Sequence, residues 1–262
     1  MKAIILAAGM GTRLGKYTKD LPKCMLNFLG KSLIERQVET LRSCGINDII
    51  VVTGYQNEKI KIAGVKYYQS EKYAETNMVE SLFSAEEELS GEILIAYSDI
   101  IYERKIINQI LNSSVDIGVT VDDDYWNYWQ ARLDVPTSDI ESLVINKEGN
   151  IIELGKVCGP EQAQVRYVGL IKLSDQGVGA LKQVYHHNKD LYYQSNEPWL
   201  GSKSFKLGYM TSLLQAIVNA GHEVKPIIIS RGWMEFDTID DYERANKWAK
   251  DNTLQRFINL QI

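Results

Sequence analysis

The N-terminal segment carries the residues best suited to chemistry. It reads LAAGMGTRL over residues 6–14, and a Pro-Lys pair ending at Lys23 follows. Glycines lack the Cβ atom, so backbone N–H groups near Gly9 and Gly11 can approach a bulky anion closely. Arg13 and Lys23 add positive charge on flexible side chains. The pattern predicts a phosphate-binding loop that directly follows a buried strand.

Two common phosphate loops do not fit this spacing. The dinucleotide fingerprint needs a third glycine at position 14, where Leu14 stands, and an acidic residue at the end of the second strand, where segment 49–54 has none. The Walker loop needs Gly-Lys-Ser/Thr five residues after its first glycine, and this is absent. The loop therefore belongs to another class of phosphate-binding protein.

Three carboxylates are candidates for a metal site. Asp99 follows the apolar run 93–97, and Glu235 and Asp237 are two residues apart, so they point the same way if their segment is extended. Chemistry that brings two phosphate groups together needs charge neutralisation, and Mg²⁺ bound by a few carboxylates provides it. The competing interpretation is that Asp99 and Asp237 only cap the helices that follow them.

Strands and helices are expected to alternate along the first half of the chain. The expected strands are 3–8, 48–53, 65–69, 92–97 and 115–121, and the expected helices are 31–43, 57–62, one starting near 77, and 103–111. This order predicts an α/β fold with a Rossmann-like, mostly parallel mixed sheet flanked by helices. Ligands bind such sheets beyond the carboxyl ends of the strands, where the Gly9 loop, Gly54-Tyr55 and Ser98-Asp99 should converge.

The alternation of strands and helices stops after residue 121. Segment 122–166 is expected to form a small antiparallel insert on the substrate side, with a hairpin of strands 141–146 and 151–154. The expected elements after it are strand 167–173, helices 175–187 and 207–220, strand 224–229 and helix 240–250. We expect one domain over 1–262, made of a nucleotide-binding half (1–121), the insert, and an acceptor-side half (167–262).

The composition excludes several classes of protein. A net charge of −5 argues against a nucleic-acid binder, and no apolar segment is long enough to span a membrane. Three cysteines without metal-ligand spacing are typical of reduced thiols, so we expect a cytoplasmic protein. The apolar C-terminal segment Leu254–Ile262 is expected to pack either on the body or on a second subunit of a homodimer.

The loop resembles that of the nucleotidyltransferase superfamily, which includes the sugar-nucleotide pyrophosphorylases. The shared residues are the LAAGxGTRL pattern and the Pro-Lys pair. The resemblance implies that Arg13 and Lys23 act in catalysis and that a metal-binding aspartate follows the central strand, at Asp99. The family often has a further Asp two residues earlier, where this chain has Tyr97. The implied nucleotide-binding residues are Leu6, Ala8, Gly9, Gly11, Thr12, Arg13, Lys23, Asn77 and Ser98, and the implied Mg²⁺ ligands are Asp99, Asp237 and Glu235.

A narrower similarity is to small CTP-dependent cytidylyltransferases that act on phosphocholine, 2-aminoethylphosphonate or related compounds. It depends on Thr53-Gly54-Tyr55, on Asn77 with its helix, and on the segment 233–238. It implies transfer of CMP from CTP to a phosphate or phosphonate, with release of pyrophosphate and a CDP-linked product for capsule, polysaccharide or lipid synthesis. Asn77 would help to read the base, or would simply cap its helix.

Two other functions stay open from the sequence. A sugar-1-phosphate nucleotidyltransferase using UTP or dTTP shares the loop, although here only Glu153 and Lys156 match the usual sugar-binding motif. A non-catalytic regulatory subunit usually lacks the loop cations or metal carboxylates, which are all present. Lys172, Arg132 or Arg166, and Tyr167 are the candidate acceptor-binding residues. Several aromatic residues form either a cation cage or ordinary packing: Trp126, Tyr128, Trp129, Tyr167, Tyr192, Tyr193 and Trp199.

Overall fold

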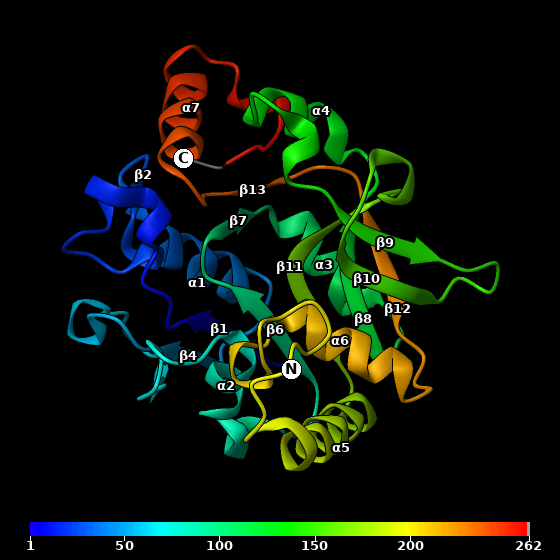
Figure 1. Cartoon of the computed structure of the whole chain (residues 1–262). Helices are drawn as coiled ribbons and strands as arrows, with labels where there is room; N and C mark the ends of the chain where they lie inside the picture. The colour runs from blue at the N-terminus through cyan, green and yellow to red at the C-terminus, as the bar shows by residue number, and fades with distance from the viewer. Residues whose placement is uncertain (261–262) are drawn as a thin grey trace.

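A computed structural model describes residues 1–260 and has a seven-stranded sheet at its centre (Figure 1). The strand order is β12-β8-β11-β6-β1-β4-β5, and every neighbouring pair is parallel except the two pairs made by β11. The sheet strands are β1 (Lys2–Ala7), β4 (Ile49–Thr53), β5 (Lys66–Gln69), β6 (Ile93–Tyr97), β8 (Ile117–Asp122), β11 (Arg166–Leu173) and β12 (Lys225–Ile229). The expected mostly parallel mixed sheet is confirmed.

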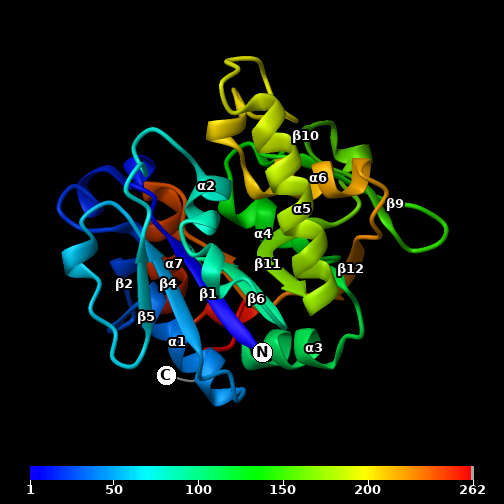
Figure 2. The same ribbon diagram turned by 90° about the horizontal axis from the view of Figure 1, so that it is seen from below.

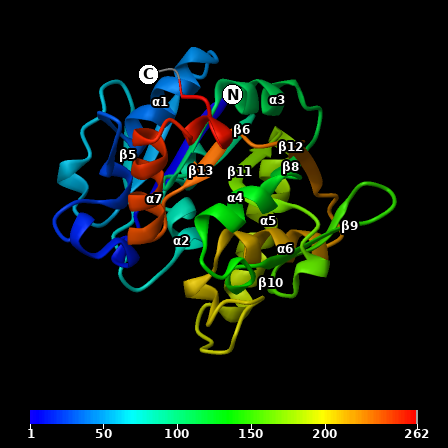
Figure 3. The ribbon, with the colours of Figure 1, turned by 90° about the horizontal axis from the view of Figure 1, so that it is seen from above.

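Helices cover both faces of this sheet. They are α1 (Leu33–Ser43), α2 (Met78–Phe83), α3 (Arg104–Asn112), α4 (Tyr125–Arg132), α5 (Asp175–Tyr192), α6 (Met210–Asn219) and α7 (Ile239–Lys250). Figure 2 views the molecule from the side on which α2, α5 and α6 lie. Figure 3 views it from the opposite side, on which α1, α4 and α7 lie. The buried side chains form two hydrophobic cores, one on each face.

The central strands are apolar on both faces because both faces are buried. In β1, Ile5 belongs to the core beneath α1 and α3, whereas its neighbour Ile4 belongs to the core beneath α2, α5 and α6. Both side chains are fully buried. A continuous apolar run is typical of a strand that lies inside a sheet covered on both sides. The sheet is thus a rigid base for the loops at its carboxyl edge.

Three short two-stranded sheets surround the main one. They pair β2 (Asn27–Phe28) with β3 (Lys31–Ser32), β7 (Ile100–Tyr102) with β13 (Trp233–Glu235), and β9 (Glu141–Ile145) with β10 (Ile151–Val157). The β9–β10 pair is the expected hairpin. The β7–β13 pair joins the segment after Asp99 to the segment before Asp237, so it fixes the positions of two candidate metal ligands relative to each other.

Segment 122–166 is only partly the antiparallel insert that the sequence predicted. Its first part forms helix α4, which packs against α7 (Figure 1). Tyr125, Tyr128 and Trp129 are at positions i, i+3 and i+4, and all three are buried in one core. This spacing places them on one helical face, and the spacing was the signal available in the sequence.

Several other boundaries differ from the prediction. Segment 57–62 contains only a short 3₁₀ turn over Asn57–Lys59. The predicted helix 207–220 is a 3₁₀ turn followed by α6, which begins only after Gly208, and α5 runs five residues beyond its predicted end. Within residues 1–260, no helix has the length and apolarity needed to cross a bilayer.

The C-terminal segment packs on the body of the protein. Leu254, Phe257 and Ile258 are buried in the same core as α1 and α4. These three residues therefore pack on the body of their own chain, which was one of the two expected arrangements. Ile262, which was included in that expectation, lies outside the described residues.

Candidate active site

A cavity of about 630 Å³ opens at the carboxyl edge of the sheet. It is bounded by the loops after β1 and β6, the start of α2, the start of β11 and the segment after β13. All nine predicted nucleotide-binding residues line it: Leu6, Ala8, Gly9, Gly11, Thr12, Arg13, Lys23, Asn77 and Ser98. Gly54 packs behind the loop instead, where a Cβ atom would lie 2.7 Å from the carbonyl oxygen of Ala8.

The glycine loop makes room for the lysine. Gly11 has φ +62°, and a Cβ atom there would lie 2.9 Å from Cβ of Lys23. The hydroxyl of Thr18 donates a 2.8 Å hydrogen bond to the carbonyl oxygen of Gly11, which fixes the turn. Around Gly9, a Cβ atom would meet no atom within 4 Å, so the backbone there faces open space. Such a loop can accept a bulky phosphate group.

Lys23 lies between two carboxylates at the base of the cavity. Its Nζ is 2.6 Å from Oδ2 of Asp99 and 2.5 Å from Oδ1 of Asp237, and Nη2 of Arg13 is 3.1 Å from the same Asp237 oxygen. Burial lowers the pKa of Lys23, but the two aspartates more than offset this, so the net pKa is raised. Burial raises the pKa of Asp237, whereas Lys23 and Arg13 lower it to a net value of about 2. Lys23 and Asp237 are therefore both charged at neutral pH.

Asp99 and Asp237 fit the requirements of a divalent cation. Because both carboxylates contact one nitrogen, their contacting oxygens lie within about 5 Å of each other. Each side chain keeps solvent contact, with exposed fractions of 24% and 19%. No cluster of three or more potential ligands is present among residues 1–260. Two carboxylates that share a site with substrate phosphates are a common arrangement for Mg²⁺. Asp99 precedes β7 rather than a helix, so the capping interpretation fails for it.

Asn77 stands at the N-terminus of α2 and lines the cavity. Its Oδ1 accepts a 2.9 Å hydrogen bond from the backbone N–H of Met78, so it caps the helix. Its Nδ2 makes only a long contact of 3.4 Å to the carbonyl oxygen of Leu207. The amide therefore has spare hydrogen-bonding capacity toward the cavity, and the two predicted roles are compatible.

Arg132 is the centre of a buried ion network, not a group facing the cavity. Its Nε and Nη2 donate to Asp241 at 2.8 and 3.0 Å, and its Nη1 contacts Glu235. Asp241 also accepts a 2.8 Å hydrogen bond from the backbone N–H of Asp237 and caps α7. Burial raises the pKa of Glu235 to about 7 although Arg132 acts in the opposite direction. Arg132 therefore supports the Asp237 segment, and Glu235 already has a partner of its own.

Lys172 lies at the opposite end of the sheet. It pairs in register with Leu94 and Gly118, near the beginnings of β6 and β8, and its Nζ donates to the carbonyl oxygen of Ser113 at 2.5 Å. The physical reason is the antiparallel direction of β11, which brings its first residues to the cavity and takes its last residues away. Arg166 and Tyr167 are those first residues, and both line the cavity. Lys172 is therefore not part of the acceptor site proposed below.

Most of the suspected aromatic cage is packing. Tyr128 and Trp129 are buried around Trp233, and Trp199 is buried against Phe205. Of the seven aromatic residues considered from the sequence, Tyr167 alone lines the cavity of the described structure.

The cavity-lining residues that sequence reasoning missed include Asp139, Glu141, Tyr209 and Thr211. Asp139 and Glu141 enter it at the beginning of β9, and the other two lie at the beginning of α6. No motif marks them. Their placement depends on how the hairpin and α6 pack on each other.

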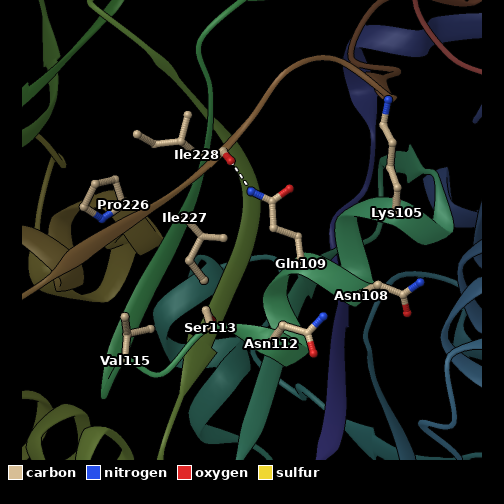
Figure 4. Close-up of a pocket in the computed structure, with 9 residues that line it drawn as sticks. All are labelled: Lys105, Asn108, Gln109, Asn112, Ser113, Val115, Pro226, Ile227 and Ile228. Carbon is tan, nitrogen blue, oxygen red and sulfur yellow. Dashed lines mark hydrogen bonds between the residues drawn. The ribbon is translucent and has the colours of Figure 1, made fainter.

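A second cavity of about 700 Å³ lies at the edge of the sheet, between α3 and β12 (Figure 4). Its polar side chains are mainly amides, and Gln109 donates to the carbonyl oxygen of Ile228 across it. Among the residues that the structure describes, no carboxylate and no glycine loop line it. The glycine loop, Lys23 and the candidate metal-binding carboxylates line the first cavity instead.

Comparisons with known proteins identify the family of the chain. The family model of the MobA-like NTP transferase domain matches residues 3–147. A CTP:phosphoglutamine cytidylyltransferase of Campylobacter jejuni is 35% identical, covering 93% of this chain and 98% of that protein. A bifunctional sugar-1-phosphate nucleotidylyltransferase/acetyltransferase of Sulfurisphaera tokodaii is 30% identical, covering 96% of this chain and 56% of that protein.

Solved structures show the same fold. The CTP:phosphocholine cytidylyltransferase from Streptococcus pneumoniae superposes with a TM-score of 0.72 at 22% identity, covering 95% of this chain and 98% of that one. Enzymes of the matched family generally use a divalent metal ion. The family match includes the loop, Lys23 and Asp99, and the relatedness extends over nearly the whole chain. The protein is thus a nucleotidyltransferase of the MobA-like NTP transferase family.

Proposed function

We propose that the protein is a Mg²⁺-dependent cytidylyltransferase that transfers CMP from CTP to the phosphate or phosphonate group of a small molecule. The observation that carries the proposal is the Lys23 cluster, in which a lysine, an arginine and two carboxylates meet beside a glycine loop. Support for CTP comes from relatives that are cytidylyltransferases for phosphoglutamine, choline phosphate and 2-aminoethylphosphonate. We further propose that the enzyme works in the cytoplasm, where CTP is made, on a precursor of capsule, polysaccharide or lipid.

The reaction forms one bond and breaks one. An oxygen of the acceptor attacks the α-phosphorus of CTP, and the bond from that phosphorus to the bridging oxygen breaks, so pyrophosphate leaves with the electron pair. The backbone N–H groups from Gly9 to Thr12 bind the triphosphate, and Arg13 and Lys23 offset the charge that builds up on the leaving group. Mg²⁺ held by Asp99 and Asp237 would neutralise phosphate charge. The fixed cavity holds the two reactants in line.

The sugar-phosphate alternative has weaker support in this structure. Glu153 and Lys156, the residues that match the sugar-binding motif, pair with each other on the β9–β10 hairpin. Neither lines the cavity within the described part of the chain. Because the relative from Sulfurisphaera tokodaii is a sugar-1-phosphate nucleotidylyltransferase, the test below also includes UTP and dTTP.

A nucleotide panel tests the proposal. The melting temperature is measured with CTP, UTP, dTTP, ATP or GTP, each with Mg²⁺ and with EDTA. We expect selective stabilisation by CTP that requires the metal, since a ligand at 100 times its Kd stabilises by about 2.7 kcal/mol. The Asp237→Asn variant should lose the Mg²⁺ requirement along with most of the shift. Stabilisation by UTP or dTTP in preference to CTP would contradict the choice of nucleotide.

A further inference from the structure

Glu141 differs from the other acidic residues of the cavity. The carboxylates of Asp99 and Asp237 contact Lys23, and that of Glu235 contacts Arg132. Asp139 lies 3.7 Å from Arg132 and 3.6 Å from Arg166. The side chain of Glu141 has no hydrogen bond and no ion pair to any residue that the structure describes. It is thus the cavity carboxylate whose charge the protein itself leaves uncompensated.

Two further polar atoms beside Glu141 lack partners. The hydroxyl oxygen of Tyr167 and Nε of Arg166 are both buried and form no hydrogen bond within residues 1–260. The guanidinium of Arg166 is held in place by Trp129, whose ring centre lies 4.4 Å from it. Gly169 accommodates Tyr97 in a shift of register on β11, and Tyr97 packs edge-on against Tyr167. Buried polar atoms without partners are uncommon, and a ligand is a recognised reason for them.

The Glu141 carboxylate would repel an acceptor that carries negative charge and no positive charge. The cavity must hold a triphosphate together with a second phosphate or phosphonate, and a bare carboxylate repels both. A cationic group on the acceptor removes this repulsion. The oxygens of Glu141 and Tyr167 accept hydrogen bonds, which a primary ammonium group donates and a quaternary ammonium group cannot. Arg166 provides the matching donor for the anionic end of the same molecule.

We propose that the acceptor is a short zwitterion with a primary ammonium group near its phosphate or phosphonate. Glu141 and Tyr167 bind the ammonium group, and Arg166 binds the phosphoryl group. This inference rests on the proposed cytidylyl transfer and narrows the class of its acceptor. Glu141 is then a specificity-determining residue, since an alkyl phosphonate of the same size without an ammonium group would leave the Glu141 carboxylate unpaired.

The test uses a matched pair of acceptors, 2-aminoethylphosphonate and propylphosphonate, which differ in having an ammonium or a methyl group. Pyrophosphate release from CTP and Mg²⁺ is measured for both. We expect the wild-type kcat/KM to favour the amine by about 10- to 100-fold, the range for a charge-assisted hydrogen bond. In Glu141→Gln the preference should fall to about threefold or less, mainly through a higher KM for the amine. Tyr167→Phe should reduce the preference by a smaller factor.

Glu148→Gln is the control, because Glu148 is exposed in the hairpin turn of the same insert and should keep the full preference. Calorimetric binding of both phosphonates to wild type and Glu141→Gln provides a readout that does not need turnover. Equal kcat/KM for the two acceptors, or an undiminished preference in Glu141→Gln, would overturn the amine site and leave cytidylyl transfer standing. A complete lack of pyrophosphate release, with amine-selective binding that needs Glu141, would contradict the proposed function alone.

Discussion

Replacing Lys23 with alanine is expected to lower kcat by about 10²–10³-fold or more while the protein stays folded. Lys23 supplies the buried positive charge nearest to the proposed metal ligands, with Nζ within 2.6 Å of both Asp99 and Asp237. Preorganised charge at a reacting phosphate acts mainly in the transition state, and loss of one such donor typically costs this much in rate. Both aspartates keep partial contact with solvent, so the variant should still fold.

The control for this prediction is Lys19→Ala. Lys19 is exposed in the same loop, and its described interaction there uses only its carbonyl oxygen, which accepts from the hydroxyl of Tyr55. Steady-state pyrophosphate release gives kcat for both variants, and circular dichroism with thermal melting checks the fold. A kcat of Lys23→Ala close to that of wild type would remove the lysine from the mechanism.

Arg132→Met is expected to lower the free energy of unfolding by about 3–5 kcal/mol, because it leaves the carboxylates of Asp241 and Glu235 without their cation. The exposed fraction of the Arg132 side chain is 2%, and that of its partner Asp241 is 1%. Methionine keeps much of the volume, so the loss reports the charge network rather than a cavity. The expected result is a clearly lower midpoint in urea denaturation, measured at pH 7.

Arg244→Met is the matched comparison. Arg244 also contacts a carboxylate, that of Asp134, but the exposed fractions of the two side chains are 32% and 78%. An exposed ion pair contributes about 0–1 kcal/mol. Similar losses of unfolding free energy in the two variants would show that the buried network has no special part in stability.

Features that depend on a short stretch of residues could be predicted from the sequence. The loop from Gly9 to Arg13 and the lysine at position 23 form one short motif, and the structure places them together in one cavity. Strands β1, β4 and β6 were also recognised, because continuous apolar runs of this length are typical of buried parallel strands. Residues near the carboxyl ends of β1 and β6 could be placed in the cavity for the same reason.

Residues whose position depends on strand direction could not be placed. Lys172 and Tyr167 are both on β11, yet only Tyr167 reaches the cavity, because the strand runs antiparallel to its neighbours. Nothing in the local sequence fixes that direction. The role of Arg132 could not be predicted either, since its partners Glu235 and Asp241 are more than a hundred residues away in the chain. Glu141 could not be predicted as a cavity residue, because its position depends on how the β9–β10 hairpin packs beside the cavity.

The most direct measurement of the central claim is identification of the product. The protein is incubated with Mg²⁺, 2-aminoethylphosphonate and either CTP, UTP or dTTP, and the products are analysed by ³¹P NMR and mass spectrometry. The account predicts pyrophosphate and a CMP-phosphonate adduct with CTP, and neither product with Lys23→Ala. An adduct formed from UTP or dTTP in preference to CTP, or a full yield from Lys23→Ala, would contradict it.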